Sequence, residues 1–313
     1  MRLNGYRFGT ECGDVPVKGY EPSLFHLPEH LRLQTNQICS FFVVHESSKK
    51  RCAEVHFQLE NGLAKSHRYA PFGSFLISTD LPAAITDRFI EYCEASLYQQ
   101  GVHQIQLVHA PGIYYESAYA VLHPLLLHRG YVLTTAEISA LVPVQHHDFQ
   151  QGLHNWERRK LRQAKQAGLL AVKLPPEELK TVYDFLTLCR EQKNYRLSLA
   201  FEEVQQLAQT FSDRLHLFAV YHTNRMAAAA LCLSINRNVL YAFYYDHHAE
   251  FDGVSPVVLL MEHIHQWCAK NDFRILDLGT SSAKTGVNYP LLAFKLHLGA
   301  VPSPKYTFQK KLA

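Results

Sequence analysis

An acidic residue near the end of a predicted strand is the first candidate for chemistry. The run FRILDLG (273–279) alternates with the period of two of a β-strand, which places Asp277 on the same face as Phe273 and Ile275. Burial raises the pKa of a carboxyl group, and a raised pKa suits a general base that takes a proton from an attacking amine. The alternative is that Asp277 caps the amides of residues 279–282. The sequence leaves both roles open.

A lysine inside an apolar helical face is the second candidate. At about 100° per residue, the run LLAFKLHL (291–298) places Lys295 between sectors of leucine and phenylalanine side chains. A lysine there either extends its ammonium group to water or meets an anion. Suitable anions are a phosphate and the oxyanion of acyl transfer, whose stabilisation contributes a few kcal/mol. The helical position alone leaves both roles of Lys295 open.

The segment between these residues, GTSSAKTGVN (279–288), has the composition of a binding loop. Its two glycines allow unusual backbone angles, and Ser281 and Asn288 supply hydrogen-bonding groups. A polar turn without a ligand has much the same composition, so both interpretations remain open.

A predicted helix earlier in the chain, WERRKLRQAKQAG (156–168), is strongly basic. Its five basic residues are Arg158, Arg159, Lys160, Arg162 and Lys165. Such runs are usually solvated faces, and the functional alternative is contact with the phosphates of a nucleotide or tRNA. Little aromatic interleaving argues against sequence-specific recognition of nucleic acid.

The elements that must position these residues follow one order. In the second half, three strand-like runs joined by short turns predict an antiparallel meander: 215–223, 226–236 and 239–246. A helix that begins at Ser255 and Pro256 follows. The strand with Asp277 and the helix with Lys295 come next, and an extended segment ends the chain.

The first half repeats this order. Its strand-like runs are 38–45, 51–60 and 63–69, followed by a helix at 82–100, a strand at 103–110, a helix at 114–130 and a strand at 131–144. The repetition is one of element order and not of residues. It predicts two similar α/β domains, 1–150 and 151–313.

Composition excludes several classes. The chain has 313 residues, 47% of them hydrophobic, and no apolar run approaches the roughly 18–20 residues that span a bilayer. Seven cysteines without a CxxC pair favour a reducing compartment, so we expect a cytoplasmic protein with free thiols. The 19 histidines are scattered, without HExxH or a cysteine–histidine cluster, and predict no metal site.

The element order and three segments resemble the GNAT acyltransferase superfamily, and more closely the tandem-GNAT proteins of the FemAB and BioF2-like kind. The segments are WERRKLRQAKQAG, LDLGTSSAKTGVN and LLAFKLHLGA, the last similar to the FK-containing segment of FemAB-type enzymes. The resemblance covers the chain from about residue 38 to the end. It implies an α/β (α+β) fold of two GNAT-like domains in tandem, each a mixed, mainly antiparallel sheet with flanking helices.

The resemblance also implies where an acyl donor binds. In GNAT folds the fourth and fifth strands separate, here 239–246 and 273–279, and amides before the next helix bind the pyrophosphate. That position holds DGVSP, which makes Gly253, Val254 and Ser255 donor-binding candidates together with Ser281, Asn288 and Arg159. Asp252 would repel phosphate and Pro256 lacks an amide donor. The donor is thus acyl-CoA or, as in FemAB-type proteins, aminoacyl-tRNA.

Further site residues follow from the same resemblance. The matching lysine of FemAB-type enzymes lies at the reaction site, as expected for Lys295. Tyr244 and Tyr245 end the third strand of the meander, and one of them, for which we choose Tyr245, would protonate the leaving group. Candidates for the acceptor side are Tyr195 and Arg196 between two helices, and Tyr69 and Phe72 in the first domain. For Phe72 and Tyr69, a buried aromatic loop is the alternative.

Together these features predict an N-acyltransferase. An acetyl or aminoacyl group would pass from a thioester or ester to the amine of a small molecule or peptide. Asp277 or a water would accept the proton, Lys295 would stabilise the oxyanion, and no metal would be required. The first domain would bind the acceptor and the second the donor. The alternative is a catalytically inactive tandem-GNAT module that binds an acyl or nucleotide ligand; the oligomeric state is left open.

Overall fold

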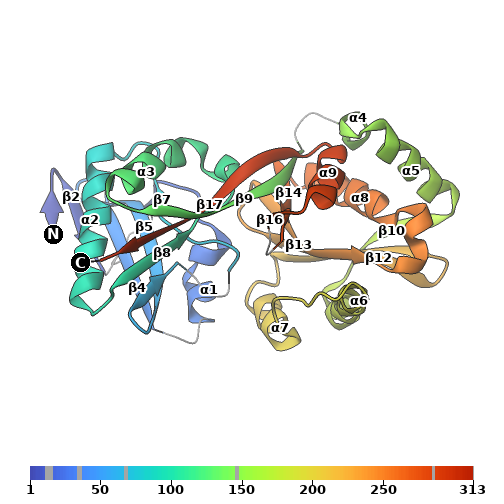
Figure 1. Ribbon diagram of the computed structural model, residues 1–313, viewed down its shortest axis with the longest axis horizontal. Helices are drawn as coiled ribbons and strands as arrows, with labels where there is room; N and C mark the ends of the chain where they lie inside the picture. Colours follow the sequence, from blue (N-terminus) through green and yellow to red (C-terminus); the bar gives the residue numbers. More distant parts are fainter. Residues whose placement is uncertain (11–16, 34–36, 67–69, 145–147, 284–285, 313) are drawn as a thin grey trace. The chain divides into compact units, whose positions relative to one another are not determined.

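The chain forms two compact units in a computed structural model that describes all residues except 11–16, 34–36, 67–69, 145–147, 284–285 and 313. Unit 1 comprises Met1–Glu137 and Pro304–Ala313, and unit 2 comprises Ile138–Ser303 (Figure 1). Each unit combines a β-sheet with helices, so the predicted α/β (α+β) class is confirmed.

Unit 1 is built on a sheet with the strand order β1-β2-β4-β5-β6-β8-β17, and β3 and β7 also pair with β5. The strands are β1 (Arg2–Leu3), β2 (Tyr6–Gly9), β3 (Val17–Lys18), β4 (Ile38–His45), β5 (Lys50–Glu60), β6 (Leu63–Lys65), β7 (Leu76–Ile77), β8 (Gln104–Val108) and β17 (Val301–Lys311). The helices are α1 (Pro28–Arg32), α2 (Ala83–Gln99) and α3 (Glu116–His128), with 3-10 turns at Leu24–His26 and Gly112–Tyr114.

Unit 2 has the strand order β9-β14-β13-β12-β11-β10. These strands are β9 (Val132–Pro143), β10 (Leu169–Leu174), β11 (Leu215–His222), β12 (Arg225–Ser234), β13 (Val239–His247) and β14 (Ile275–Thr280), and a small hairpin adds β15 (Ser282–Ala283) and β16 (Gly286–Val287). The pairing of β13 with β14 is parallel, whereas β10 to β13 pair antiparallel as the predicted meander requires.

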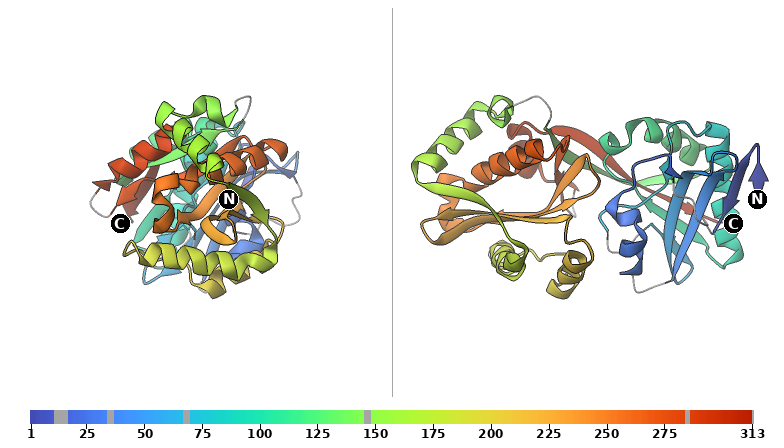
Figure 2. Two further views of the ribbon diagram at one scale, coloured as in Figure 1. Left: turned by 90° about the vertical axis from the view of Figure 1, so that its right-hand side faces the viewer. Right: turned by 180° about the vertical axis from the view of Figure 1, so that it is seen from behind.

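Helices cover both faces of the unit 2 sheet. They are α4 (Phe149–Gly152), α5 (Asn155–Gln166), α6 (Leu179–Glu191), α7 (Phe201–Thr210), α8 (Pro256–Lys270) and α9 (Tyr289–His297), with 3-10 turns at Pro176–Glu178 and Ala249–Val254. α6 and α7 lie on the face opposite to α8 (Figures 1 and 2). Because both faces are covered, Ala227–Cys232 of β12 is fully buried along its whole length.

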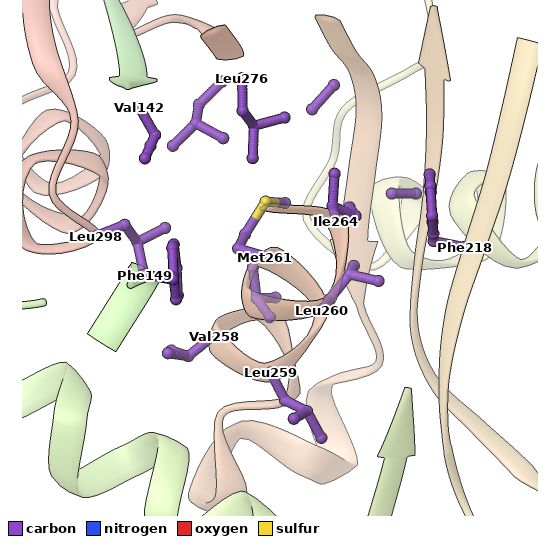
Figure 3. Packing of buried hydrophobic residues seen from close by; sticks show 14 of the residues in the cluster. Val142, Phe149, Phe218, Val258, Leu259, Leu260, Met261, Ile264, Leu276 and Leu298 are labelled. Carbon is purple, nitrogen blue, oxygen red and sulfur yellow. The ribbon is translucent and has the colours of Figure 1, made fainter. Parts of the chain in front are cut away.

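The core of unit 2 forms around α8. Val258, Met261 and Ile264 recur at helical spacing and are all 0% exposed. They pack against Phe218 and Leu276 from the sheet, and Phe149 and Leu298 cover the other side (Figure 3). This core fixes the helix α8, which follows β13, and the strand β14, which carries Asp277.

Two strands, β9 and β17, pair in the other unit from the one that the order of the sequence would suggest. Residues Leu141–Pro143 of β9 pair with β14 in unit 2, although the first half of the sequence supplies them. In return, Thr307–Lys311 of β17 pairs with β8 in unit 1. The compact units therefore divide within β9 and β17, because a strand belongs to the sheet that it pairs with, and the boundary at 150/151 remains a prediction.

Candidate active site

The site begins where the parallel pairing of β13 and β14 ends. Only three residue pairs join the strands, the last being Tyr241 with Asp277. β13 then continues to His247, and β14 shifts its register against β9 between Asp277 and Thr280. The resemblance implied that these two strands separate. Beyond the last pair lie Tyr245 on β13 and Ser281 after β14, which the sequence analysis named as candidates.

Asp277 organises the end of β14. Its carboxylate is 2% exposed, and Oδ1 accepts a hydrogen bond of 2.7 Å from the amide of Gly279. Gly279 has a φ of 75°, a conformation that glycine adopts without strain. Asp277 thus caps a loop amide, as one sequence-based alternative expected, while its buried charge stays at the centre of the site.

Lys295 meets this loop from α9. Its side chain is 2% exposed, and Nζ donates to the carbonyl oxygens of Gly279 at 3.0 Å and Thr280 at 2.8 Å. The alternative that Lys295 extends to water is therefore excluded. Two of its three N–H groups are used, and no described residue accepts the third. A buried ammonium group with a remaining donor is suited to an oxygen that becomes negative during a reaction.

The environment of Lys295 weakens its basicity. Burial lowers the pKa of the ammonium group to about 8, since a charge is poorly solvated there. The negative charge of Asp277 opposes this shift, and the positive charge of Arg190 adds to it. Lys295 therefore changes its charge close to neutral pH.

A β-bulge decides which tyrosine faces the site. Leu231 of β12 pairs with Tyr244 and Cys232 pairs with Ala242, so Phe243 is the extra residue. Ala242 belongs to the core around α8, and Tyr245, three positions later, packs against the same core. The bulge thus reverses the alternation that the sequence alone would predict.

The two tyrosines have separate partners. The Tyr244 hydroxyl lies 2.6 Å from Ser198 Oγ and accepts from the amide of Leu199 at 3.0 Å, which ties β13 to the segment between α6 and α7. The Tyr245 hydroxyl donates to the carbonyl of Leu278 at 3.3 Å, next to Asp277. Burial raises the pKa of Tyr245, so its phenol stays protonated at neutral pH.

Arg190 is a site residue that the sequence reasoning missed. Its Nη2 donates to the carbonyl of Tyr245 at 3.3 Å, and its Nε lies 3.2 Å from Oδ2 of Asp246. Lys193 contacts the other oxygen of Asp246 at 2.5 Å. The only sequence signal was its place shortly before Tyr195 and Arg196, because nothing in a helix pattern shows which strand a side chain will contact.

The loop residues Ser281 and Asn288 support the ends of the site. Ser281 is 0% exposed, its amide donates to Ile138, and its hydroxyl has no hydrogen-bond partner among the described residues. The side-chain oxygen of Asn288 accepts from the amide of Leu291 at 3.1 Å and so caps α9. Asn288 therefore has a structural task, whereas the Ser281 hydroxyl keeps its hydrogen-bonding capacity.

The start of α8 offers few backbone amides to a pyrophosphate. The amides of Ser255 and Val258 are already bonded to Phe251 and Ser255, and Pro256 has none. Ser255 has a φ of 47° and makes no side-chain cap. Gly253 and Val254 precede it in an exposed to half-buried 3-10 turn, beside the exposed carboxylate of Asp252. Two amides of this turn are thus occupied and one is missing, which reduces the donors that the pyrophosphate of coenzyme A would use in the usual GNAT manner.

The acceptor candidates differ in exposure. Tyr195 is 57% exposed, and Arg196 beside it is exposed as well, after the turn at Asn194. Phe72 is 3% exposed and packs edge-on against Phe25 and Tyr114 inside unit 1. Its surroundings match the alternative of a buried aromatic loop. Tyr69 lies outside the described residues.

Arg159 lies on the outer face of α5, where its guanidinium group stands 4.9 Å from the centre of the Trp156 ring. It belongs to a different element from the Asp277–Lys295 centre.

Among the described residues, no group of three or more histidine, cysteine, aspartate or glutamate side chains could hold a metal ion. None of the described helices combines the length and hydrophobicity that a bilayer crossing needs.

Known proteins share this architecture. Residues 153–289 match the family described as an acetyltransferase (GNAT) domain. FemX has a TM-score of 0.71 at 13% identity over 94% of both chains, and a tandem GNAT protein from the clavulanic acid biosynthesis pathway has 0.52 at 11% over 88% of this chain and 83% of that one. L-PGS from Bacillus licheniformis has 0.54 at 13% over 84% and 82%.

These structural similarities establish the fold, and at identities this low they leave the substrates open. No curated protein matches the sequence. The expected resemblance is confirmed at this level, since the likeness to FemX extends over nearly the whole of both chains. The chain thus has the fold shared by FemX and the tandem GNAT protein, and its residues 153–289 match the acetyltransferase (GNAT) domain family.

Proposed function

We propose that the chain is an N-acyltransferase whose reaction centre is formed by Lys295, Asp277 and Tyr245. One observation carries the proposal: Lys295 is buried at 2% exposure, and the carbonyls of Gly279 and Thr280 hold its ammonium group where the β13–β14 pairing ends. A structural lysine would more commonly reach water, because burying an ammonium group costs several kcal/mol. The GNAT match at 153–289 supports acyl transfer as the use of this group.

The reaction would proceed by addition and elimination. The nitrogen lone pair of a neutral amine forms a bond to the acyl carbon of a thioester or ester, and the carbonyl electrons move onto oxygen. The third N–H of Lys295 stabilises this oxyanion. The bond to the leaving sulfur or oxygen then breaks, with the electron pair on the leaving atom. The amine loses one proton and the leaving group gains one, so the step needs no net proton from solution.

The neighbouring groups have complementary parts in this scheme. Tyr245 stays protonated because burial raises its pKa, so it is suited to give a proton to the leaving group. Asp277 is suited to accept the amine proton, directly or through a water, since its buried carboxylate lies beside the Gly279 turn that also holds Lys295. Ser281, with its buried hydroxyl, would contact the donor.

Aminoacyl-tRNA fits the donor side better than acyl-CoA. The amides at Ser255 and Val258 are occupied, which leaves the usual pyrophosphate position with few donors. An ester of tRNA does not depend on that position. The exposed residues Tyr195 and Arg196 would receive a small-molecule or peptide amine as acceptor.

The same occupied amides favour a second candidate, a catalytically inactive module that binds an acyl or nucleotide ligand. Such a module would bind a donor or its fragment at the Lys295 centre without transferring the acyl group. It differs from the enzyme in one measurable respect, the absence of product at saturating donor and amine.

A thermal-shift screen tests the proposal. Purified protein is melted with acetyl-CoA, longer acyl-CoAs, free CoA and aminoacyl-tRNA, because specific binding at a hundredfold excess over Kd contributes about 2.7 kcal/mol. Any donor that raises Tm is then incubated with amine acceptors, and product is measured by mass spectrometry. Product formation supports the enzyme, and a shift without product supports the binding module. No shift with any donor contradicts both.

A further inference from the structure

The part of β9 that belongs to unit 1 has an open edge. β9 lies between β17 and β14, but β14 pairs only with its residues from Ser139 to Pro143. No described strand pairs with the preceding residues on that side. Five consecutive residues there are all exposed, although they belong to a strand: Val132, Leu133, Thr134, Thr135 and Ala136.

Alternate residues of this segment direct their backbone groups to the open edge. The amide of Ser281 donates to the carbonyl of Ile138, so Ile138 directs its backbone groups away from β17. In an antiparallel ladder the N–H and C=O of one residue point to the same side, and this side alternates along the strand. The unpaired groups of Val132, Thr134 and Ala136 therefore point outward, as they would toward a further strand.

The open edge carries none of the features that usually keep strand edges apart. Such features are charged side chains, prolines and bulges. The strands that end the sheet order do have exposed charges, Arg2 in β1 and Lys173 in β10. The run VLTTA (132–136) has no charge, proline or glycine, and it is rich in β-branched residues. It is therefore suited to pair with another strand.

Helix α3 extends this surface beside the edge. The ring of His123 lies 5.4 Å from the rings of Tyr306 and Phe308, so α3 covers β17, the strand next to β9. The exposed residues of α3 after its first turn recur at the spacing of a helix face that packs on another helix. They are Ser117, Ala120, Val121, Pro124, Leu127 and His128.

The composition of α3 calls for a partner on this outer face. Its inner face is buried through Ala118, Leu122 and Leu126, whereas Leu127 on the outer face is 53% exposed. No charged residue occurs between Glu116 and Arg129. A helix that is apolar on opposite faces is typically covered on both.

The charges around the surface are neutralised inside unit 1. Arg129 pairs with Asp87 at 3.1 Å and with Glu94 at 2.9 Å, and Lys310 also lies 2.9 Å from Glu94. The surface thus offers little to a strongly charged partner. Two copies of it can meet without repulsion between like charges, so its electrostatics are complementary to themselves.

A second copy of the chain fits both parts of the surface at once. A two-fold axis through Thr134, perpendicular to the sheet, pairs the edge with itself in antiparallel fashion. Val132 then lies opposite Ala136 and Leu133 opposite Thr135, which brings apolar and β-branched side chains together. The same axis keeps both copies of α3 on one face of the joined sheet and turns their outer faces toward each other.

From these observations we infer that the open edge of β9 and the outer face of α3 form an interface with a second copy of the chain. Stable interfaces use about 20–30 residues on each side, and this surface supplies five from β9 and six from α3. It therefore lies at the small end of the range, which corresponds to a reversible dimer with a Kd of about 10 µM. The inference does not rest on the proposed function.

Sedimentation velocity of the full chain between about 1 and 100 µM tests the interface, since this range spans the expected Kd. The weight-average mass should rise from that of one chain toward that of two. Thr134→Pro removes an outward amide without touching the pairing with β17, so it should abolish the dimer. Leu127→Glu places two like charges together in the dimer and should raise Kd at least about 10-fold. Melting curves check that both variants are folded.

The matched control is Leu188→Glu on α6, because this leucine is also exposed, at 47%, but lies in unit 2. A dimer that persists in the control and is lost in the other two variants supports the interface. Hydrogen exchange should then slow with concentration at Val132, Thr134 and Ala136. A wild type that stays monomeric at about 100 µM, or a dimer that survives both variants, would overturn the inference. Binding of monomers to phosphatidylcholine vesicles that Leu127→Glu abolishes would assign the face to a bilayer and overturn it as well.

Discussion

Asp277 and Lys295 form the centre of the proposed site, and the sequence showed their positions but not their partners. The patterns placed Asp277 near a strand end and Lys295 in an apolar face, and both are 2% exposed. The sequence offered water or an anion as the partner of Lys295. The structure shows that its ammonium group contacts the backbone carbonyls of Gly279 and Thr280. Backbone carbonyls are present at every position, so no residue type could reveal them. The exposed Tyr195 and Arg196 and the buried Phe72 show the same limit, since exposure follows from packing.

The lowered pKa of Lys295 has a consequence for stability. Between about 8 and its ordinary value of 10.5, the folded lysine is neutral while the unfolded one still binds a proton. The unfolded state therefore holds more protons, and the free energy of unfolding rises with pH in this window. Relative to Lys295→Met, the wild type should gain up to a few kcal/mol between these pH values, measured by urea denaturation. A difference independent of pH would show that burial does not shift this lysine.

At the scale of elements, the periodic patterns were informative and the irregular positions were not. The meander, the helix after it and the helix with Lys295 all exist as β11 to β13, α8 and α9. The edge strand β10 and the bulge at Phe243 were missed, because a bulge depends on the register of two strands and leaves no mark in one of them. The bulge nevertheless decides which tyrosine faces Leu278.

Paired tyrosine variants test the two sides of β13. Tyr244→Phe removes the contacts to Ser198 and Leu199, so it should lower the free energy of unfolding by about 1–2 kcal/mol. Tyr245→Phe loses one bond of 3.3 Å and should change stability less, while product formation falls about 10²-fold or more. Denaturation and initial rates are measured on both. A larger rate loss in Tyr244→Phe would reverse the assignment.

The turn after Asp277 depends on a glycine. Gly279→Ala places a Cβ at a φ of 75° and 3.5 Å from the Tyr241 ring, so strain should lower the free energy of unfolding by about 1–2 kcal/mol. The same change displaces the carbonyls that hold Lys295, so the rate should fall as well. Gly253→Ala is the matched control, because its Cβ would meet open space at an ordinary φ. Equal stability of the two variants would contradict this role for Gly279.

For the molecule as a whole, the repeated element order correctly indicated two GNAT-like halves, but it could not show which strand pairs with which sheet. Residues 307–311 pair with β8 in unit 1, across about two hundred residues of sequence. Long-range pairing of this kind is set by the three-dimensional sheet and not by local propensity. The assignment of acceptor binding to the first half and donor binding to the second remains a prediction.

Truncation tests this exchange of strands. A chain that ends at Ser303 loses one of the two strands that pair with β8 and also the buried Phe308, which is 2% exposed, at a cost of several kcal/mol. Hydrogen exchange should then increase throughout unit 1 and remain slow in β12 and α8 of unit 2. A chain shortened only by Leu312 and Ala313 serves as the control. Unchanged protection of β8 in the longer truncation would contradict the pairing.

The central claim, that Lys295 is the reaction centre of an acyltransferase, is tested most directly by single-turnover transfer with wild type and Lys295→Met. The donor is the compound that raises Tm in the screen, and an amine is supplied in excess. We expect the wild type to transfer the acyl group and the variant to do so about 10²–10³-fold more slowly, with both proteins folded in the same melting range. Equal rates in the two proteins would contradict the claim.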